Sequence, residues 1–151
     1  MAQQIARRNR LREDLESALA SIARAVGTPL KLSAEGRCGL RIGGFRQDIV
    51  IEWIEPVACV AVHAAAPPEL TRDPPHRLAA TLMLLQVGGV ATRGCALWLL
   101  PDHGLRVALT LVGPTLDDAQ LLEAIGRVAR ACEELEGRIE AGLRGTARAG
   151  R

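Results

Sequence analysis

Three short apolar runs joined by very short connectors restrict the possible folds of this chain more than any other feature. The runs cover residues 37–42, 48–54 and 57–64. Gly43-Gly44 and Pro56 mark the breaks between them. Parallel neighbours need a crossover connection of a dozen or more residues, which these breaks cannot provide. The sequence therefore predicts three strands that pair antiparallel as a meander.

Two segments with helical periodicity enclose these strands. They cover residues 4–26 and 118–143. In both segments apolar residues recur at spacings of three and four, which places them on one stripe. Gly27 and Pro29 predict the end of the first helix, and Thr115 with Asp118 predicts a capping box at the start of the last. The stripes consist of Leu11, Leu15, Ala18, Leu19, Ile22 and Val26, and of Leu121, Ile125, Val128, Cys132, Leu135, Ile139 and Leu143.

A further helix is predicted at residues 76–87, and it is apolar nearly all round. One small sheet can cover only one side of such a helix. A second copy of the chain is the simplest partner for the other side. Two strands at 95–100 and 105–112 then form a hairpin around a Pro-Asp-His-Gly turn.

The predicted order is helix, three strands, helix, two strands, helix. This order defines the α+β class, with an antiparallel sheet of about five strands and three helices. We expect residues 1–143 to form a single domain and residues 144–151 to form a flexible basic tail.

The net charge of +2 is unevenly distributed along the chain. Residues 1–12 contain four arginines and no acid, and residues 144–151 contain three arginines and no acid. Subtracting these seven charges from +2 leaves −5 for residues 13–143, so the body is mildly acidic. We interpret the basic ends as solvated termini. Contact with nucleic acid or anionic lipid is the alternative.

Composition excludes several classes of protein. Only three aromatic residues occur in the 151, too few for binding single-stranded nucleic acid by base stacking. The four cysteines are widely spaced and lack a C-x-x-C pair, so we expect free, mostly buried thiols in a reducing cytoplasm. The N-terminal segment lacks the apolar core of a secretory signal. The longest mostly apolar stretch, residues 78–91, is too short to span a membrane.

No catalytic pattern stands out in the sequence. The three histidines, His63, His76 and His103, form no zinc-binding motif, and we expect no metal or cofactor. The glycines of residues 89–94 have P-loop spacing but lack the required Lys and Ser/Thr. Cys59 and His63 share a strand face but are too far apart to act as a nucleophile–base pair. Abundant apolar surface without reactive groups favours a binding protein, and the open edges of an antiparallel sheet favour a polypeptide ligand.

The element order across residues 4–143 resembles the class I type III secretion chaperones, the small dimeric group that includes the chaperone of the intimin receptor. The local resemblance is best in the stretch LMLLQVGGVATRGCALWLLPDHGLRVALTLVGPTLDDAQLLEAIGRVARACEELEGRIE. There a buried helix ends at a glycine-bearing turn, a hairpin follows, and a leucine-rich acidic helix closes the domain. Two features depart from the group: the pI is about 8.5 where members are usually acidic, and Gln86-Val87-Gly88 follows the second helix where Asn is frequent.

The resemblance implies a cytoplasmic bacterial homodimer that holds the N-terminal segment of a secreted effector without catalysis. It also implies contact with the secretion ATPase or sorting platform, and no nucleic acid or membrane insertion. By similarity, an apolar groove would bind the effector through Leu11, Leu15, Ile22, Leu40, Ile42 and Val50. The dimer interface would contain Leu78, Leu82, Met83, Leu85, Trp98 and Leu100.

Two other functions remain open on the sequence. A regulator with the same fold could sequester a transcription activator or anti-activator. A thioesterase-like enzyme or small-ligand carrier would need a polar group at the end of an apolar pocket, for which His63 and Glu52 are the candidates.

Overall fold

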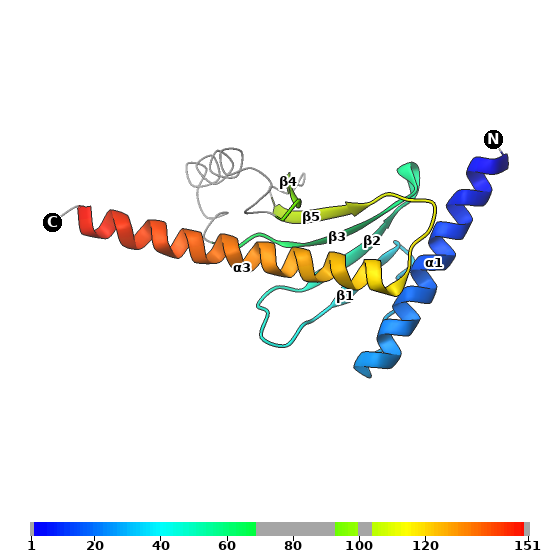
Figure 1. The fold of residues 1–151 in the computed structure, drawn as a ribbon, viewed down its shortest axis with the longest axis horizontal. Coiled ribbons are helices and arrows are strands. Elements are labelled where there is room, and N and C mark those ends of the chain that lie inside the picture. The colour runs from blue at the N-terminus through cyan, green and yellow to red at the C-terminus, as the bar shows by residue number, and fades with distance from the viewer. Residues whose placement is uncertain (1, 69–92, 100–103, 150–151) are drawn as a thin grey trace.

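Figure 1 shows the computed structural model of the chain, which describes residues 2–68, 93–99 and 104–149. In this part of the chain two long helices lie against a five-stranded sheet. The helices are α1, Ala2–Val26, and α3, Asp118–Ala149. The strands are β1, Arg37–Leu40; β2, Ile49–Ile54; β3, Cys59–Ala65; β4, Ala96–Leu99; and β5, Leu105–Leu111.

The strands have the order β1-β2-β3-β5-β4, and every neighbouring pair is antiparallel. β1, β2 and β3 form the predicted meander, and β4 and β5 form the predicted pair. The α+β class and the five-stranded antiparallel sheet are therefore confirmed. The predicted helix at 76–87 lies outside the described residues.

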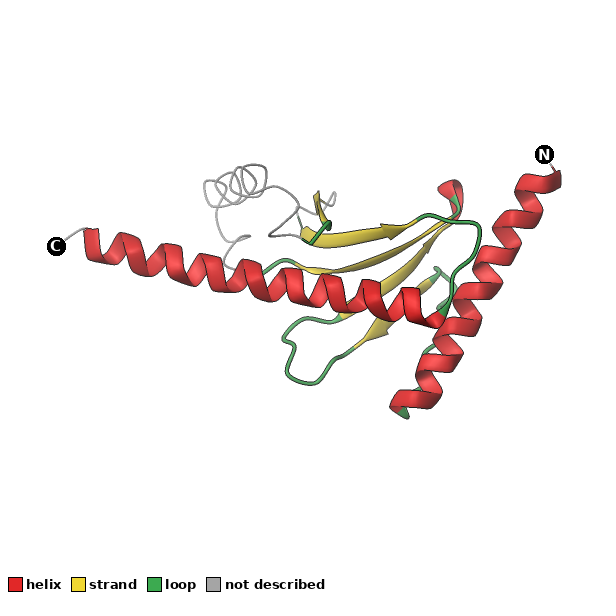
Figure 2. Ribbon diagram, in the orientation of Figure 1, coloured by secondary structure: helices red, strands yellow, loops and turns green. Residues whose placement is uncertain are grey.

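Both helices cover the same face of the sheet (Figure 2), and the hydrophobic core lies between the two layers. Alternation along β2 explains why this face is apolar: Ile49, Ile51 and Trp53 are buried there, whereas the intervening residues lie on the other face. The stripes of α1 and α3 complete the core with Leu15, Leu19, Leu121 and Val128, each at most 1% exposed. The predicted apolar stripes of the two helices therefore face the core.

Two polar contacts fix α1 against the start of α3. The Ser21 hydroxyl lies 3.1 Å from Asp118 Oδ2, and the Leu116 N–H donates to Asp14 Oδ2 at 3.2 Å. The second contact satisfies a backbone donor near the helix start, where α3 has no internal partner for it. These bonds hold the two helices in the crossed arrangement seen in Figure 1.

The predicted cap of α3 is wrong by two residues. Asp117 and Gln120 form the reciprocal pair instead: the Gln120 N–H donates to Asp117 Oδ1 at 2.7 Å, and the Asp117 N–H donates to Gln120 Oε1 at 3.0 Å. Asp is as good a cap as Ser or Thr, and a Gln three residues later completes the box.

Two element boundaries also differ from prediction. The third strand begins at Cys59 and not at residue 57, because Glu55–Val57 form a single 3-10 turn, η1, and Ala58 has φ +50°. The last helix continues to Ala149, into the segment expected to be a flexible tail. Extending an existing helix costs far less than starting one, so the glycines near its end do not stop it.

The four cysteines, Cys38, Cys59, Cys95 and Cys132, are free and buried, as predicted. Neither of the described helices is long and apolar enough to cross a bilayer.

Candidate functional site

The three helix residues predicted to bind an effector lie in the chain's own core. Leu11, Leu15 and Ile22 are 4%, 0% and 3% exposed, and they belong to the core that α1 shares with α3 and the sheet. An apolar stripe predicts that a helix face is covered, but it does not say whether the same chain or a partner covers it. Their role in binding stays a prediction, and this arrangement gives a partner little access to them.

The three strand residues of the predicted groove are not gathered at one place. Leu40 pairs with Ile49 on the helix-covered face, and Ile42 also packs against the core. Val50 pairs with His63 on the opposite face of the sheet. A strand places successive side chains on opposite faces, so β2 cannot present Val50 to a groove beneath the helices.

Only one residue of the predicted dimer interface lies in the described part of the chain. Trp98 is half-buried on β4, an edge strand, and its ring centroid lies 5.8 Å from that of His63. The other predicted interface residues lie outside the described residues: Leu78, Leu82, Met83, Leu85 and Leu100.

A groove of about 700 Å³ lies between the second half of α1 and the chain that follows it. Its apolar part contains Leu19, Ala23, Leu30 and Leu32, of which Leu19 and Leu30 are buried. We call this surface the α1 groove. It is lined by Arg12, Glu16, Leu19, Ala20, Ala23, Arg24, Pro29, Leu30, Lys31, Leu32 and Ser33.

The sequence after α1 explains why the groove forms. Gly27 adopts a left-handed φ of +68°, and Pro29 prevents the helix from continuing. Leu30 and Leu32 then turn inward on either side of the exposed Lys31. The Leu-Lys-Leu alternation of residues 30–32 is the sequence signal for this second wall, and it was missed among the predicted elements.

A tight turn anchors this wall to the sheet. The Gly36 N–H donates to Ser33 O at 3.0 Å, and the Trp53 N–H donates to Gly36 O at 2.8 Å. Gly36 has φ +77°, and a Cβ there would lie 3.2 Å from Trp53 O, so a side chain fits poorly. By contrast, residues 30–32 make no backbone–backbone hydrogen bond within the described chain. The groove therefore has a wall whose peptide groups are not paired to other peptide groups there, although the backbone of Lys31 bonds to the Cys38 thiol.

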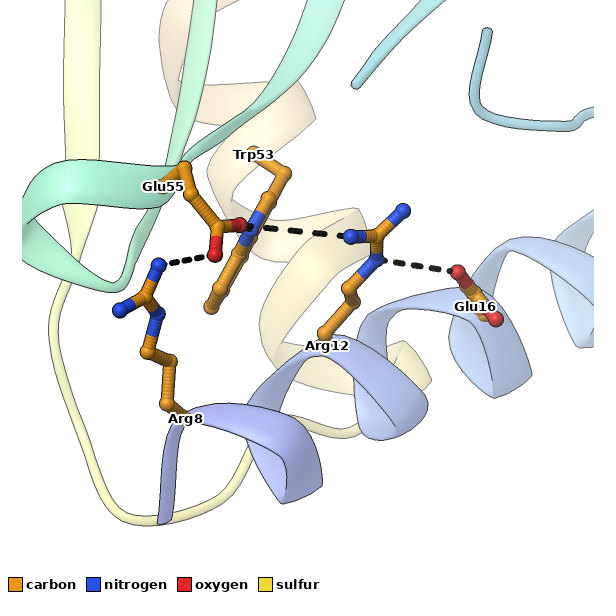
Figure 3. Close-up of polar contacts among 5 residues, drawn as sticks. All are labelled: Arg8, Arg12, Glu16, Trp53 and Glu55. Carbon is orange, nitrogen blue, oxygen red and sulfur yellow. Dashed lines mark hydrogen bonds and ion pairs between the residues drawn. The ribbon is translucent and has the colours of Figure 1, made fainter. Parts of the chain in front are cut away.

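A carboxylate at the end of β2 fixes the position of α1 (Figure 3). Glu55 accepts hydrogen bonds from the Trp53 indole and from Arg8, and its Oε2 lies 4.0 Å from Arg12 Nη1. The indole bond, followed by Arg8, lowers the pKa of Glu55, so the carboxylate is ionised near neutral pH. Arg12 Nε also lies 3.4 Å from Glu16 Oε1. Since Arg12 and Glu16 both line the α1 groove, this network positions one of its ends.

A polar chain crosses the other face of the sheet. His63 is 6% exposed; its Nε2 lies 3.1 Å from Glu52 Oε2, and its Nδ1 accepts a hydrogen bond from Arg106 Nε at 2.6 Å. Glu52 also accepts from Arg37 Nε at 2.8 Å. Because Nδ1 accepts, the neutral ring carries its proton on Nε2 and donates it to Glu52. Burial, followed by the charge of Arg106, lowers the pKa of His63.

Among the described residues, Cys59 and His63 do not form a nucleophile–base pair. Burial raises the pKa of Cys59, which keeps its thiol protonated. Both ring nitrogens of His63 are held by Glu52 and Arg106, so neither is directed at the thiol. Among the described residues there is also no group of three or more His, Cys, Asp or Glu that could hold a metal ion.

Solved structures with the same fold include a chaperone-effector complex, a type III secretion chaperone and a complex from a type III secretion system. A structure of the HopA1-SchA chaperone-effector complex matches with a TM-score of 0.60 at 15% identity, covering 83% of this chain and 93% of that one. The Yersinia pestis type III secretion chaperone SycH, in complex with a fragment of YscM2, matches with a TM-score of 0.56 at 15% identity, covering 80% and 98%. The heterodimeric ExoU-SpcU complex from the type III secretion system of Pseudomonas aeruginosa matches with a TM-score of 0.55 at 18% identity, covering 80% and 93%.

No family model matches the sequence, and no curated protein matches it significantly. At these identities the structural matches establish a common fold. The chain therefore has the fold of the class I type III secretion chaperones, in agreement with the resemblance found in the sequence.

Proposed function

We propose that this protein is a type III secretion chaperone that binds the N-terminal segment of a secreted effector as a homodimer. It keeps that segment soluble and competent for secretion, in the bacterial cytoplasm and without catalysis. The observation that carries the proposal is the fold itself: four-fifths or so of the chain superposes on proteins solved in complex with effectors or other partners.

The described surface supports binding in preference to chemistry. The α1 groove is apolar at its base and partly open to solvent, which suits a bound peptide. The titratable groups of the opposite face bond to one another and not to a nucleophile. This polar chain offers no support for the thioesterase-like alternative.

The homodimer rests on the sequence of residues 76–87, whose apolar residues surround the predicted helix. Substituting Leu82→Asp would place a charge in an apolar contact, which is strongly unfavourable. We expect this variant to be monomeric or aggregated in size-exclusion chromatography with light scattering. A soluble dimer of normal mass would show that Leu82 lies elsewhere.

Coexpression tests the effector role directly. The tagged chain is coexpressed with N-terminal segments of proteins exported by the type III system of the same bacterium. We expect one segment to become soluble, to elute with two copies of the chain, and to resist limited proteolysis. If every exported segment stays insoluble or protease-sensitive, the chaperone proposal fails. A regulator would instead protect a transcription activator or anti-activator, so coexpression with such proteins distinguishes the alternative.

A further inference from the structure

The charge of the α1 groove differs from the charge of the protein around it. The lining contains three cations, Arg12, Arg24 and Lys31, and one carboxylate, Glu16. Residues 13–143 as a whole carry −5, as shown above. An excess of positive charge around an apolar groove is therefore a local feature of an acidic body.

Two of the three cations are available to a ligand. Arg12 is held by Glu16 and Glu55. Arg24 and Lys31 are both exposed, and neither forms an ion pair within the described chain. Arg24 belongs to the last turn of α1 and Lys31 to the extended wall, so each wall of the groove supplies one cation.

Each of these charges has a simpler interpretation when taken alone. Arg24 at a helix C-terminus interacts favourably with the helix dipole, and an exposed lysine between two leucines keeps a loop soluble. Neither interpretation explains why both cations lie on one apolar groove. Charge complementarity is the explanation that covers both.

The shape of the groove indicates the kind of ligand that would use these charges. Its base is formed by Leu19, Leu30 and Leu32. The backbone of Lys31 bonds to the Cys38 thiol, whereas the peptide groups of Leu30 and Leu32 make no bond to another peptide group in the described chain. An extended peptide can pair with such a wall while alternate side chains enter the apolar base. The intervening side chains then point toward the rims, where Arg24 and Lys31 lie.

We infer that the α1 groove selects an extended effector segment in which carboxylates flank apolar side chains, and that Arg24 and Lys31 provide this selection. The inference rests on the proposed function, because the segment belongs to the effector. To the proposed function it adds the chemistry of the bound segment and the two residues that recognise it.

Three fluorescent peptides test the inference with the full-length chain. They share alternating Leu and Val residues and differ only in the flanking positions, which are Glu, Lys or Ser. Affinities come from fluorescence anisotropy at low and at high salt. Since exposed ion pairs contribute modestly, we expect the Glu peptide to bind roughly 3- to 10-fold more tightly than the Ser peptide at low salt. The difference should shrink at high salt.

Variants assign this preference to the two cations. The double variant Arg24→Glu/Lys31→Glu should favour the Lys peptide, and Arg24→Gln/Lys31→Gln should bind the Glu and Ser peptides equally. The matched control is Arg10→Glu/Arg138→Glu, which makes the same change of charge at exposed positions outside the groove and should keep the preference of the unmodified chain. Thermal denaturation followed by circular dichroism confirms that each variant is folded.

A separate variant tests the location of the peptide. Ala20 is exposed and lines the groove, so Ala20→Trp should fill the groove without disturbing the core. We expect it to abolish binding of all three peptides.

Three results would overturn the inference. They are failure of the unmodified chain to bind the Glu peptide, equal affinities for the three peptides, and a preference that the control double variant loses as fully as the groove double variant. If Ala20→Trp still binds the peptides, the α1 groove is not the binding site. None of these results removes the proposed function, which fails only if the coexpression assay finds no protected effector segment.

Discussion

Leu15 offers the sharpest test of the structure, because two interpretations of one residue predict different results. The family resemblance implies that Leu15 contacts an effector. The structure places it with 0% exposure in the core that α1 shares with α3 and the sheet. We predict that Leu15→Ala destabilises the free chain, with no effector present.

The expected loss follows from the burial of the side chain. Leu→Ala removes roughly three methylene-sized groups, and burial of each contributes about 0.8 kcal/mol, which gives about 2.4 kcal/mol. A cavity left in the core adds to this, so the free energy of unfolding should fall by about 3–4 kcal/mol. With a urea m-value of about 2 kcal/mol/M, the midpoint of unfolding falls by roughly 1.5–2 M.

Urea unfolding followed by far-ultraviolet circular dichroism measures this change, at one fixed protein concentration because association also affects stability. Ile5→Ala is the matched control, since Ile5 lies on the same helix but is 51% exposed. It should change stability by about 0.5 kcal/mol or less. If Leu15→Ala keeps the normal midpoint yet loses effector binding, the core assignment is refuted and the role implied by the resemblance is supported.

Three further predictions concern titratable groups. Burial and the charge of Arg106 lower the pKa of His63 from 6.5, so the unfolded chain binds this proton more readily than the folded chain. The free energy of unfolding should therefore decrease as the pH falls from 6.5 to the folded-state pKa. His63→Gln should lose that part of the pH dependence. If the variant keeps the same dependence of stability on pH, His63 is not its source. Glu55→Gln should speed amide hydrogen exchange in the first turns of α1, around Arg8, more than in the second half of the helix. If exchange changes equally in both halves, the Glu55 contacts do not hold the start of the helix. Burial raises the pKa of Cys132 to about 12, so this thiol should react with a disulfide reagent only after unfolding, and rapid labelling of the native chain would refute its burial.

Most of the described fold could be predicted because its signals are local. The short breaks around Gly43-Gly44 and Pro56 determine antiparallel pairing whatever the rest of the chain does. The stripes of residues 4–26 and 118–143 determine two helices with one apolar face each. The errors lie at the ends of elements, as with the cap formed by Asp117, where several polar residues compete for the same role.

The candidate site was less predictable, because apolar residues of the core and of a binding surface look alike in sequence. Leu11, Leu15 and Ile22 were predicted to form the effector groove; the structure shows them buried in the core, and their role in binding stays a prediction. The groove uses the next part of the chain, where the alternation of Leu30, Lys31 and Leu32 is too short to predict a strand.

By itself, the sequence determined which segments are helices and strands, how neighbouring strands pair, and that reactive motifs are missing from its pattern. These properties depend on spacing along the chain and on connector length. Only the tertiary structure decided which apolar faces the chain covers itself and which charges share a groove. It joined Arg24 to Lys31 across an apolar base, and His63 to Arg106 across two strands. Such contacts depend on how whole elements pack, and packing is decided by shape and burial over the entire core.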